Sequence, residues 1–213
     1  MAFNKKELDN SFKSIAIEGF SFKKEIMGYS WTKKCSNRIE RIIIGYTGYP
    51  NSYKAYTPTT AIYFPEVEDI LIKYGLAEEY KSTFGRAFQD LNDVEYEKLG
   101  MEINSVEGFS VVKSVVYNIL EKGVMPFLAR FTTLEEIANF LADKKVEEIV
   151  PYIQGAILLP KTVLIMKLAS HTDFMKRLVE FRNVLLEYAS TNNRYQVLLN
   201  KYDELFSEDL NIV

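Results

Sequence analysis

The sequence predicts an α+β protein in which an N-terminal helix packs on a three- to four-stranded antiparallel β-meander, followed by an α-helical half built of helical hairpins. Apolar residues alternate with a period of two between residues 27 and 64, as they do in half-buried strands. Before and after that segment they recur at helical spacing. With 213 residues, of which 47% are hydrophobic, the chain is long and apolar enough to bury a core.

The first helix is expected over residues 4–17. Lys and Glu separate its apolar residues, and Gly19 follows as a stop signal. The apolar positions that define its buried stripe are Leu8, Phe12, Ile15 and Ala16.

Three strands are expected to follow as a meander. In the first, Met27, Tyr29 and Trp31 share one side, and small or polar residues occupy the other. The second strand covers residues 38–46 and is rich in isoleucine. The third covers residues 53–64 and contains Pro58, which has no N–H and suits an edge position or a bulge.

Helical periodicity dominates from Pro65 onward. A helix begins near Glu66 and ends before Gly75, and a strongly amphipathic helix over residues 108–122 is expected to stop at Gly123. Thr132 or Thr133 caps a short helix through the segment TLEE. Short connections join the later helices, so sequence neighbours should form hairpins; these helices are 144–152, 160–168, 173–189 and 192–206.

The change from strands to helices divides the chain into two expected domains. Residues 1–104 would form the α+β meander domain and residues 105–213 an all-helical domain, with the two packed as one compact unit.

Charge is distributed unevenly along the chain. The net charge is −3, but residues 1–64 carry ten Lys or Arg against five Asp or Glu, and the remainder is acidic. An overall acidic chain argues against a dedicated nucleic-acid-binding protein. The basic N-terminal part instead favours an acidic protein partner.

The aromatic residues of the meander allow two interpretations. If they were exposed beside lysine and arginine, the sheet could stack single-stranded nucleic acid. Alternation favours the other interpretation, in which Tyr29 and Trp31 face the helix and enter the core. The basic residues and the tyrosines in or next to the loop then remain as candidate binding residues: Lys33, Lys34, Arg38, Arg41, Tyr49, Tyr53 and Tyr56.

Histidine and cysteine chemistry is limited because each residue occurs once. His171 is expected in the turn before a helix, where Ser170, Thr172 and Asp173 surround it. Cys35 is expected as a turn thiol. One imidazole and one thiol cannot build a usual zinc or iron site, so the sequence predicts no metal and no cofactor.

Acidic pairs leave open an enzyme with a carboxylate site, for which Glu66, Glu68 and Asp69 are the candidates. Catalysis would require a buried acid with a raised pKa or several acids around a cation. Neighbouring acids on a helix point in different directions, so we expect these side chains to be solvated.

Five segments together resemble an uncharacterised bacterial family of domains of unknown function. They are the leading helix, the pair Gly19-Phe20 with Phe22-Lys23-Lys24, a meander ending in AIYFPEVEDIL, the segment GVMPFLARFTTLEEIANFL, and the helical tail. The resemblance implies no catalytic residues. It implies a small α+β protein of the kind that serves as an immunity or accessory factor near toxin systems.

The sequence therefore favours a non-catalytic protein-binding domain. Weak binding of single-stranded nucleic acid and a carboxylate enzyme stay as alternatives. The lone cysteine fits a reducing cytoplasm, the start MAFNKKELDN lacks a secretory h-region, and no apolar run reaches the length of a membrane span.

Overall fold

A computed structural model describes residues 3–79, 82–153, 155 and 157–210, and it confirms the α+β class. Contacts divide the chain into two units: residues 1–62 with 86–130, and residues 63–85 with 131–213. This division differs from the expected sequential split after residue 104. It arises because residues 63–85 pack with the later helices, whereas residues 105–130 pack with the sheet.

Helix α1 (Lys5–Lys13) opens the first unit. Asn4 caps it, since its side chain accepts hydrogen bonds from the backbone N–H groups of Lys6 and Glu7, and its own backbone N–H donates to the Glu7 carboxylate. The side chains of Leu8 and Phe12, four residues apart on one face of α1, are completely buried, as the helical spacing predicts.

In the part of the chain that the structure describes, the sheet has six strands, two more than the upper number expected. They are β1 (Ser21–Glu25), β2 (Gly28–Lys34), β3 (Ile39–Tyr49), β4 (Ser52–Ala55), β5 (Thr59–Tyr63) and β6 (Phe84–Ala87). The order is β1-β2-β3-β5-β6, and β4 pairs with β3 outside this path. The expected third strand is thus two strands that separate around Pro58, and β1 and β6 were not predicted.

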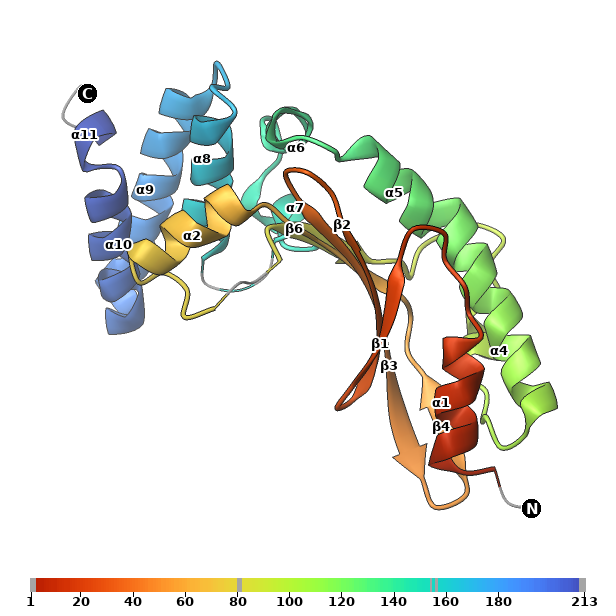
Figure 1. The fold of residues 1–213 in the computed structure, drawn as a ribbon. Coiled ribbons are helices and arrows are strands. Elements are labelled where there is room, and N and C mark those ends of the chain that lie inside the picture. The colour runs from red at the N-terminus through yellow and green to blue at the C-terminus, as the bar shows by residue number, and fades with distance from the viewer. Residues whose placement is uncertain (1–2, 80–81, 154, 156, 211–213) are drawn as a thin grey trace. The chain divides into compact units, whose positions relative to one another are not determined.

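Helix α4 (Val106–Ile119) and helix α1 lie on the same side of β1, β2 and β3 (Figure 1). The ring centroids of Phe12 and Phe109 are 5.0 Å apart, and Phe12 also stacks on Tyr29 of β2. The two helices therefore bury one face of the meander.

The prediction that α4 ends at Gly123 was wrong. The chain continues through the π-helix η1 (Leu120–Val124) into α5 (Met125–Arg130). A Cβ at Gly123 would lie 2.6 Å from Phe88 and 2.7 Å from Leu91, so glycine here allows close packing rather than helix termination. The short helix α3 (Tyr96–Leu99) also belongs to this unit.

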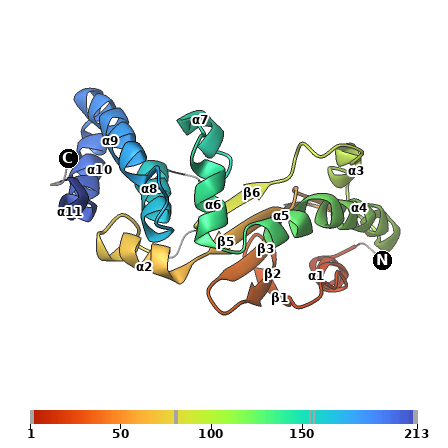
Figure 2. The ribbon, with the colours of Figure 1, turned by 90° about the horizontal axis from the view of Figure 1, so that it is seen from above.

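The second unit is mainly helical (Figure 2). Thr133 caps α6 with a complete capping box, as predicted. Helices α9 and α10 meet at Asn192 and pack against each other as a hairpin. The helices of this unit are α2 (Pro65–Lys73), α6 (Leu134–Leu141), α7 (Val146–Ile149), α8 (Leu158–Leu168), α9 (Phe174–Thr191), α10 (Asn193–Leu205) and α11 (Ser207–Leu210).

Candidate functional site

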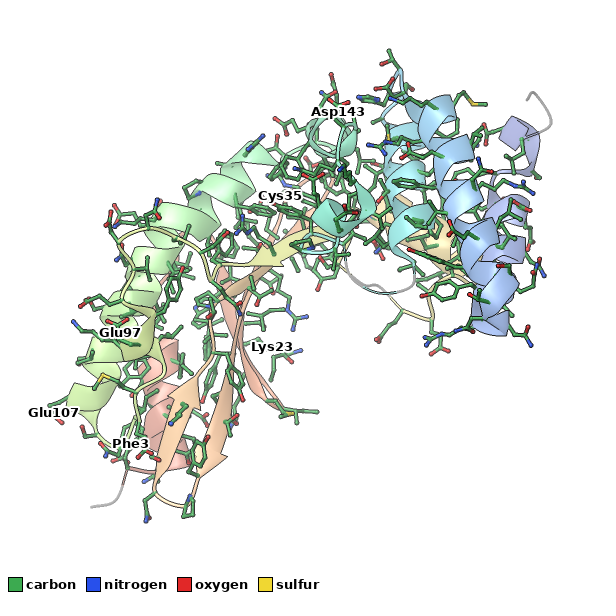
Figure 3. The ribbon with its side chains drawn as sticks, turned by 180° about the vertical axis from the view of Figure 1, so that it is seen from behind. Phe3, Lys23, Cys35, Glu97, Glu107 and Asp143 are labelled. Carbon is green, nitrogen blue, oxygen red and sulfur yellow. The ribbon has the colours of Figure 1, made fainter. Side chains whose placement is uncertain are left out.

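The strand register separates the meander into two faces. Trp31 lies opposite both Phe22 and Ile42, and these residues face α1. Ser30 lies opposite both Lys23 and Ile43, on the other side of the sheet. We call the first side the covered face and the second the open face; Lys23 is labelled on the open side in Figure 3.

The open face carries an excess of positive charge. By register, its charged residues on β1 to β4 are four cations and one carboxylate: Lys23, Lys34, Arg41, Lys54 and Glu25. Lys23 and Lys34 are exposed. Part of the excess of Lys and Arg over Asp and Glu in residues 1–64 therefore lies on the open face of the sheet.

Glu25 organises the charges at one end of this face. Its carboxylate accepts hydrogen bonds from Arg41 Nη2 at 2.6 Å and Ser30 Oγ at 2.9 Å. Lys23 Nζ lies 3.6 Å away. Partial burial opposes ionisation, but the Ser30 hydrogen bond and the nearby charge of Arg41 outweigh it and lower the pKa of Glu25.

An exposed apolar cluster lies at the β1–β2 turn. Ile26 is 95% exposed and Met27 is 73% exposed. Gly45 lies next to the Met27 carbonyl, and the 54% exposed Tyr56 ring covers Gly45 on the open face. We call Ile26, Met27 and Tyr56 the hairpin patch.

The structure distributes the predicted basic residues over both faces. Lys34 and Arg41 lie on the open face. Lys33 lies opposite Glu40 on the covered face, with its ammonium 5.8 Å from the centre of the Phe20 ring. Arg38 donates a hydrogen bond from Nε to the buried Glu40 at 2.9 Å. The four predicted cations therefore do not form one cluster.

The predicted tyrosines are also divided. Tyr49 and Tyr56 are exposed on the open face, and the hydroxyl of Tyr56 contacts that of Thr47. Tyr53 lies on the covered face, where its ring forms an edge contact with Phe3, which is labelled in Figure 3.

The inward orientation predicted for the large rings is confirmed. Tyr29 is 0% exposed and Trp31 is 1% exposed, and the indole N–H of Trp31 donates to the Ile15 carbonyl at 2.9 Å. Burial and a hydrogen bond to Asp9 raise the pKa of Tyr29. A stacking platform for nucleic acid would therefore lack its two largest members.

The single histidine and cysteine occupy turns, as predicted. His171 Nδ1 accepts a hydrogen bond from the backbone N–H of Asp173 at 3.1 Å, just before α9. The backbone N–H of Cys35 donates to the Arg38 carbonyl at 2.8 Å in the β2–β3 turn. Across the described ranges, no group of three or more His, Cys, Asp or Glu is arranged to hold a metal ion.

The candidate carboxylates on α2 are not one cluster. Glu66 and Asp69 are exposed, as expected. The expectation of a solvated side chain was wrong for Glu68, which is 0% exposed. It accepts hydrogen bonds from Lys161 Nζ at 2.9 Å and Thr83 Oγ1 at 2.6 Å. Glu68 is buried because an ammonium and a hydroxyl replace water around it.

Sequence reasoning did not identify the hairpin patch or the contributions of Lys23 and Lys54. The signal was present for the turn, since Ile26-Met27 is an apolar pair between a charged residue and Gly28. The exposed turn was missed because the alternation assigned Met27 to the buried side of a strand, together with Tyr29 and Trp31. The strand in fact begins at Gly28, which moves Met27 into the exposed turn.

Comparisons of this chain with protein-family models, with curated proteins and with solved structures gave no match. Among the helices that the structure describes, none has the length and hydropathy that crossing a membrane requires.

Proposed function

We propose that this protein is a non-catalytic binding domain whose open face contacts an acidic partner protein. The observation that carries the proposal is the hairpin patch, in which Ile26 and Met27 are strongly exposed at the β1–β2 turn and the exposed Tyr56 ring lies over Gly45. Apolar residues gathered at one place on a surface commonly mark protein interfaces, and aromatic residues contribute strongly to binding.

Charge supports an acidic partner. On strands β1 to β4, the cations of the open face exceed the one carboxylate there by three, and that carboxylate is already engaged by Arg41. A partner with an apolar centre and an acidic rim would complement this surface and associate faster at low ionic strength. Binding without catalysis is also the role implied by the resemblance to a bacterial family of domains of unknown function, since related small α+β proteins serve as immunity or accessory factors.

Site-directed photocrosslinking tests the proposal in the native host extract. A photoreactive residue at Met27 should capture one defined protein, whereas the same residue at Val106 should not. Val106 is a matched control because it is also an exposed apolar residue of the first unit, at 59% exposure, but lies at the start of α4.

Direct binding then tests the captured protein. With purified partner, Ile26→Ser combined with Met27→Ser should weaken binding by about 2 kcal/mol or more, as expected for central interface residues. Reversal of Lys34 and Lys54 to Glu should weaken it further at low salt and less at high salt. Equal capture at positions 27 and 106, or binding unchanged in all these variants, would reject the open face as the interface.

A further inference from the structure

The covered face contains a cation enclosed by tyrosine rings. Lys5 Nζ lies 3.7 Å from the ring centre of Tyr46, 4.7 Å from that of Tyr29 and 6.0 Å from that of Tyr53. The same ammonium lies 2.6 Å from the Tyr29 hydroxyl and 2.9 Å from Asp9. We call Tyr29, Tyr46, Tyr53 and Asp9 the tyrosine cage.

The walls of the cage are fixed by the sheet. Tyr29, Tyr46 and Tyr53 come from β2, β3 and β4, three paired strands. The rings of Tyr29 and Tyr46 are inclined by 28°, whereas those of Tyr46 and Tyr53 meet at 73°. The cage therefore presents walls in two orientations around one point, and its three rings are carried by the sheet and not by the helix of Lys5.

This arrangement has the chemistry of a site for alkylated ammonium groups. Several aromatic rings within about 6 Å of a cation, with a carboxylate nearby, are the usual means of binding quaternary ammonium. A quaternary group is more weakly hydrated than the primary ammonium of lysine, so it loses less hydration on entering such a cage.

Lys5 is the first residue of α1, and other residues anchor that helix. The Lys5 side chain is 34% exposed, so the cage is open toward solvent on the side of the lysine. Helix α1 is held elsewhere by Leu8 and Phe12, which are completely buried. Asp9 also keeps a cationic partner when Lys5 moves, because Lys24 Nζ lies 2.5 Å from its other oxygen.

We propose that the tyrosine cage binds an alkylammonium head group and that Lys5 is its displaceable internal occupant. The head group could belong to a small choline-like molecule or to a methylated lysine of a peptide, since both present the same cation. This site lies on the covered face, so the proposal does not depend on the open face as a protein interface.

Removing the internal occupant gives the most direct test. Lys5→Ala should lower the thermal midpoint by about 2–6 °C through the lost cation–π and hydrogen-bonding contacts. Choline chloride should then restore the midpoint in a saturable manner. Its neutral isostere 3,3-dimethylbutan-1-ol and equal concentrations of sodium chloride should not do so.

Wild-type protein provides the second measurement. Choline should shift the ring resonances of Tyr46 and Tyr53 with an apparent Kd about tenfold weaker than in Lys5→Ala, because Lys5 competes at high effective concentration. If a short trimethyllysine peptide binds at least as tightly as choline, the natural ligand is a methylated lysine of a protein. If choline binds more tightly than the peptide, the natural ligand is a small molecule.

The aromatic wall supplies the matched control. Tyr46→Ala should abolish the response of the Lys5→Ala background to choline. The proposal is overturned if Lys5→Ala gains no saturable response, or if the isostere or Tyr46→Ala gives the same response. Should Lys5→Ala fail to fold in buffer, its refolding yield with choline against the isostere decides between the same two outcomes.

Discussion

The ammonium of Lys161 in α8 lies 2.9 Å from the carboxylate of Glu68 in α2, and water reaches neither side chain. Three further hydrogen bonds surround this buried pair. Lys161 donates to the Ser82 carbonyl at 2.9 Å, and Thr83 donates to Glu68 while accepting from Phe64 N at 3.0 Å. The pair thus joins two helices and the segment before β6 within the second unit.

Removing one charge of this pair should destabilise the protein strongly. Glu68→Gln removes the carboxylate charge 2.9 Å from the buried Lys161 ammonium, and breaking a buried ion pair in this way typically costs about 3–5 kcal/mol. Urea unfolding of the whole chain, monitored by circular dichroism, should show this loss in the free energy of unfolding.

The double substitution Glu68→Leu with Lys161→Met is the matched control for that loss. An apolar pair removes both charges, so its cost should be well below the sum of the two single substitutions. If Glu68→Gln alone changed the free energy of unfolding by less than about 1 kcal/mol, the pair would not be buried as described.

Asp9 should make stability depend on pH under acidic conditions. Burial opposes its ionisation, but hydrogen bonds from Lys24, Lys5 and Tyr29 outweigh burial and hold the pKa of Asp9 below its ordinary value of 3.8. The unfolded state then binds a proton more readily than the folded state. The stabilisation from Asp9 is therefore fully present above pH 3.8 and is lost as the pH falls below it.

Asp9→Asn isolates this contribution. Relative to wild type, it should be less stable in urea near neutral pH, and the difference should shrink as the pH falls through 3.8. Glu25 and Glu136 also have lowered pKa values, but wild type and Asp9→Asn both contain them, so their effect cancels in the difference. A stability difference that grew in acid would contradict the assignment.

Local patterns predicted most of the fold. Period-two alternation correctly placed Tyr29 and Trp31 on the buried side of a strand, and the TLEE segment correctly marked the cap at Thr133. The end of α4 was missed because the constraint at Gly123 is tertiary. Glycine there accommodates Phe88 and Leu91, whereas the sequence shows only a residue that commonly ends helices.

The candidate site was less predictable because it depends on register. The pairing of β3 with β4 places Tyr53 on the covered face against Tyr46 and leaves Tyr49 on the open face. The tyrosine cage joins one helix and three strands. Local periodicity cannot identify such a set of residues.

Trp31 gives a direct optical measure of the buried face. Because it is the only tryptophan and is 1% exposed, its fluorescence emission should be blue-shifted and resistant to iodide quenching in the native state. Unfolding should move the emission to longer wavelength and restore quenching. Native emission already typical of a solvated indole would contradict the inward orientation of this face.

Gly45 should control the shape of the hairpin patch. A Cβ at this position would lie 2.9 Å from Cδ2 of the Tyr56 ring, so Gly45→Ala must displace the ring. Because the obstructed atom belongs to an exposed side chain, the cost in stability should be small, about 1 kcal/mol or less. Partner binding should nevertheless weaken.

Gly28→Ala is the matched control on the neighbouring strand. Its Cβ would lie 2.7 Å from the Ile44 carbonyl oxygen, which belongs to the backbone and cannot rotate away. It should therefore lower the free energy of unfolding by more than Gly45→Ala does. Chemical denaturation measures stability and titration with the captured partner measures binding. Equal stability losses in the two variants would show that the Tyr56 ring cannot move aside and would contradict this prediction.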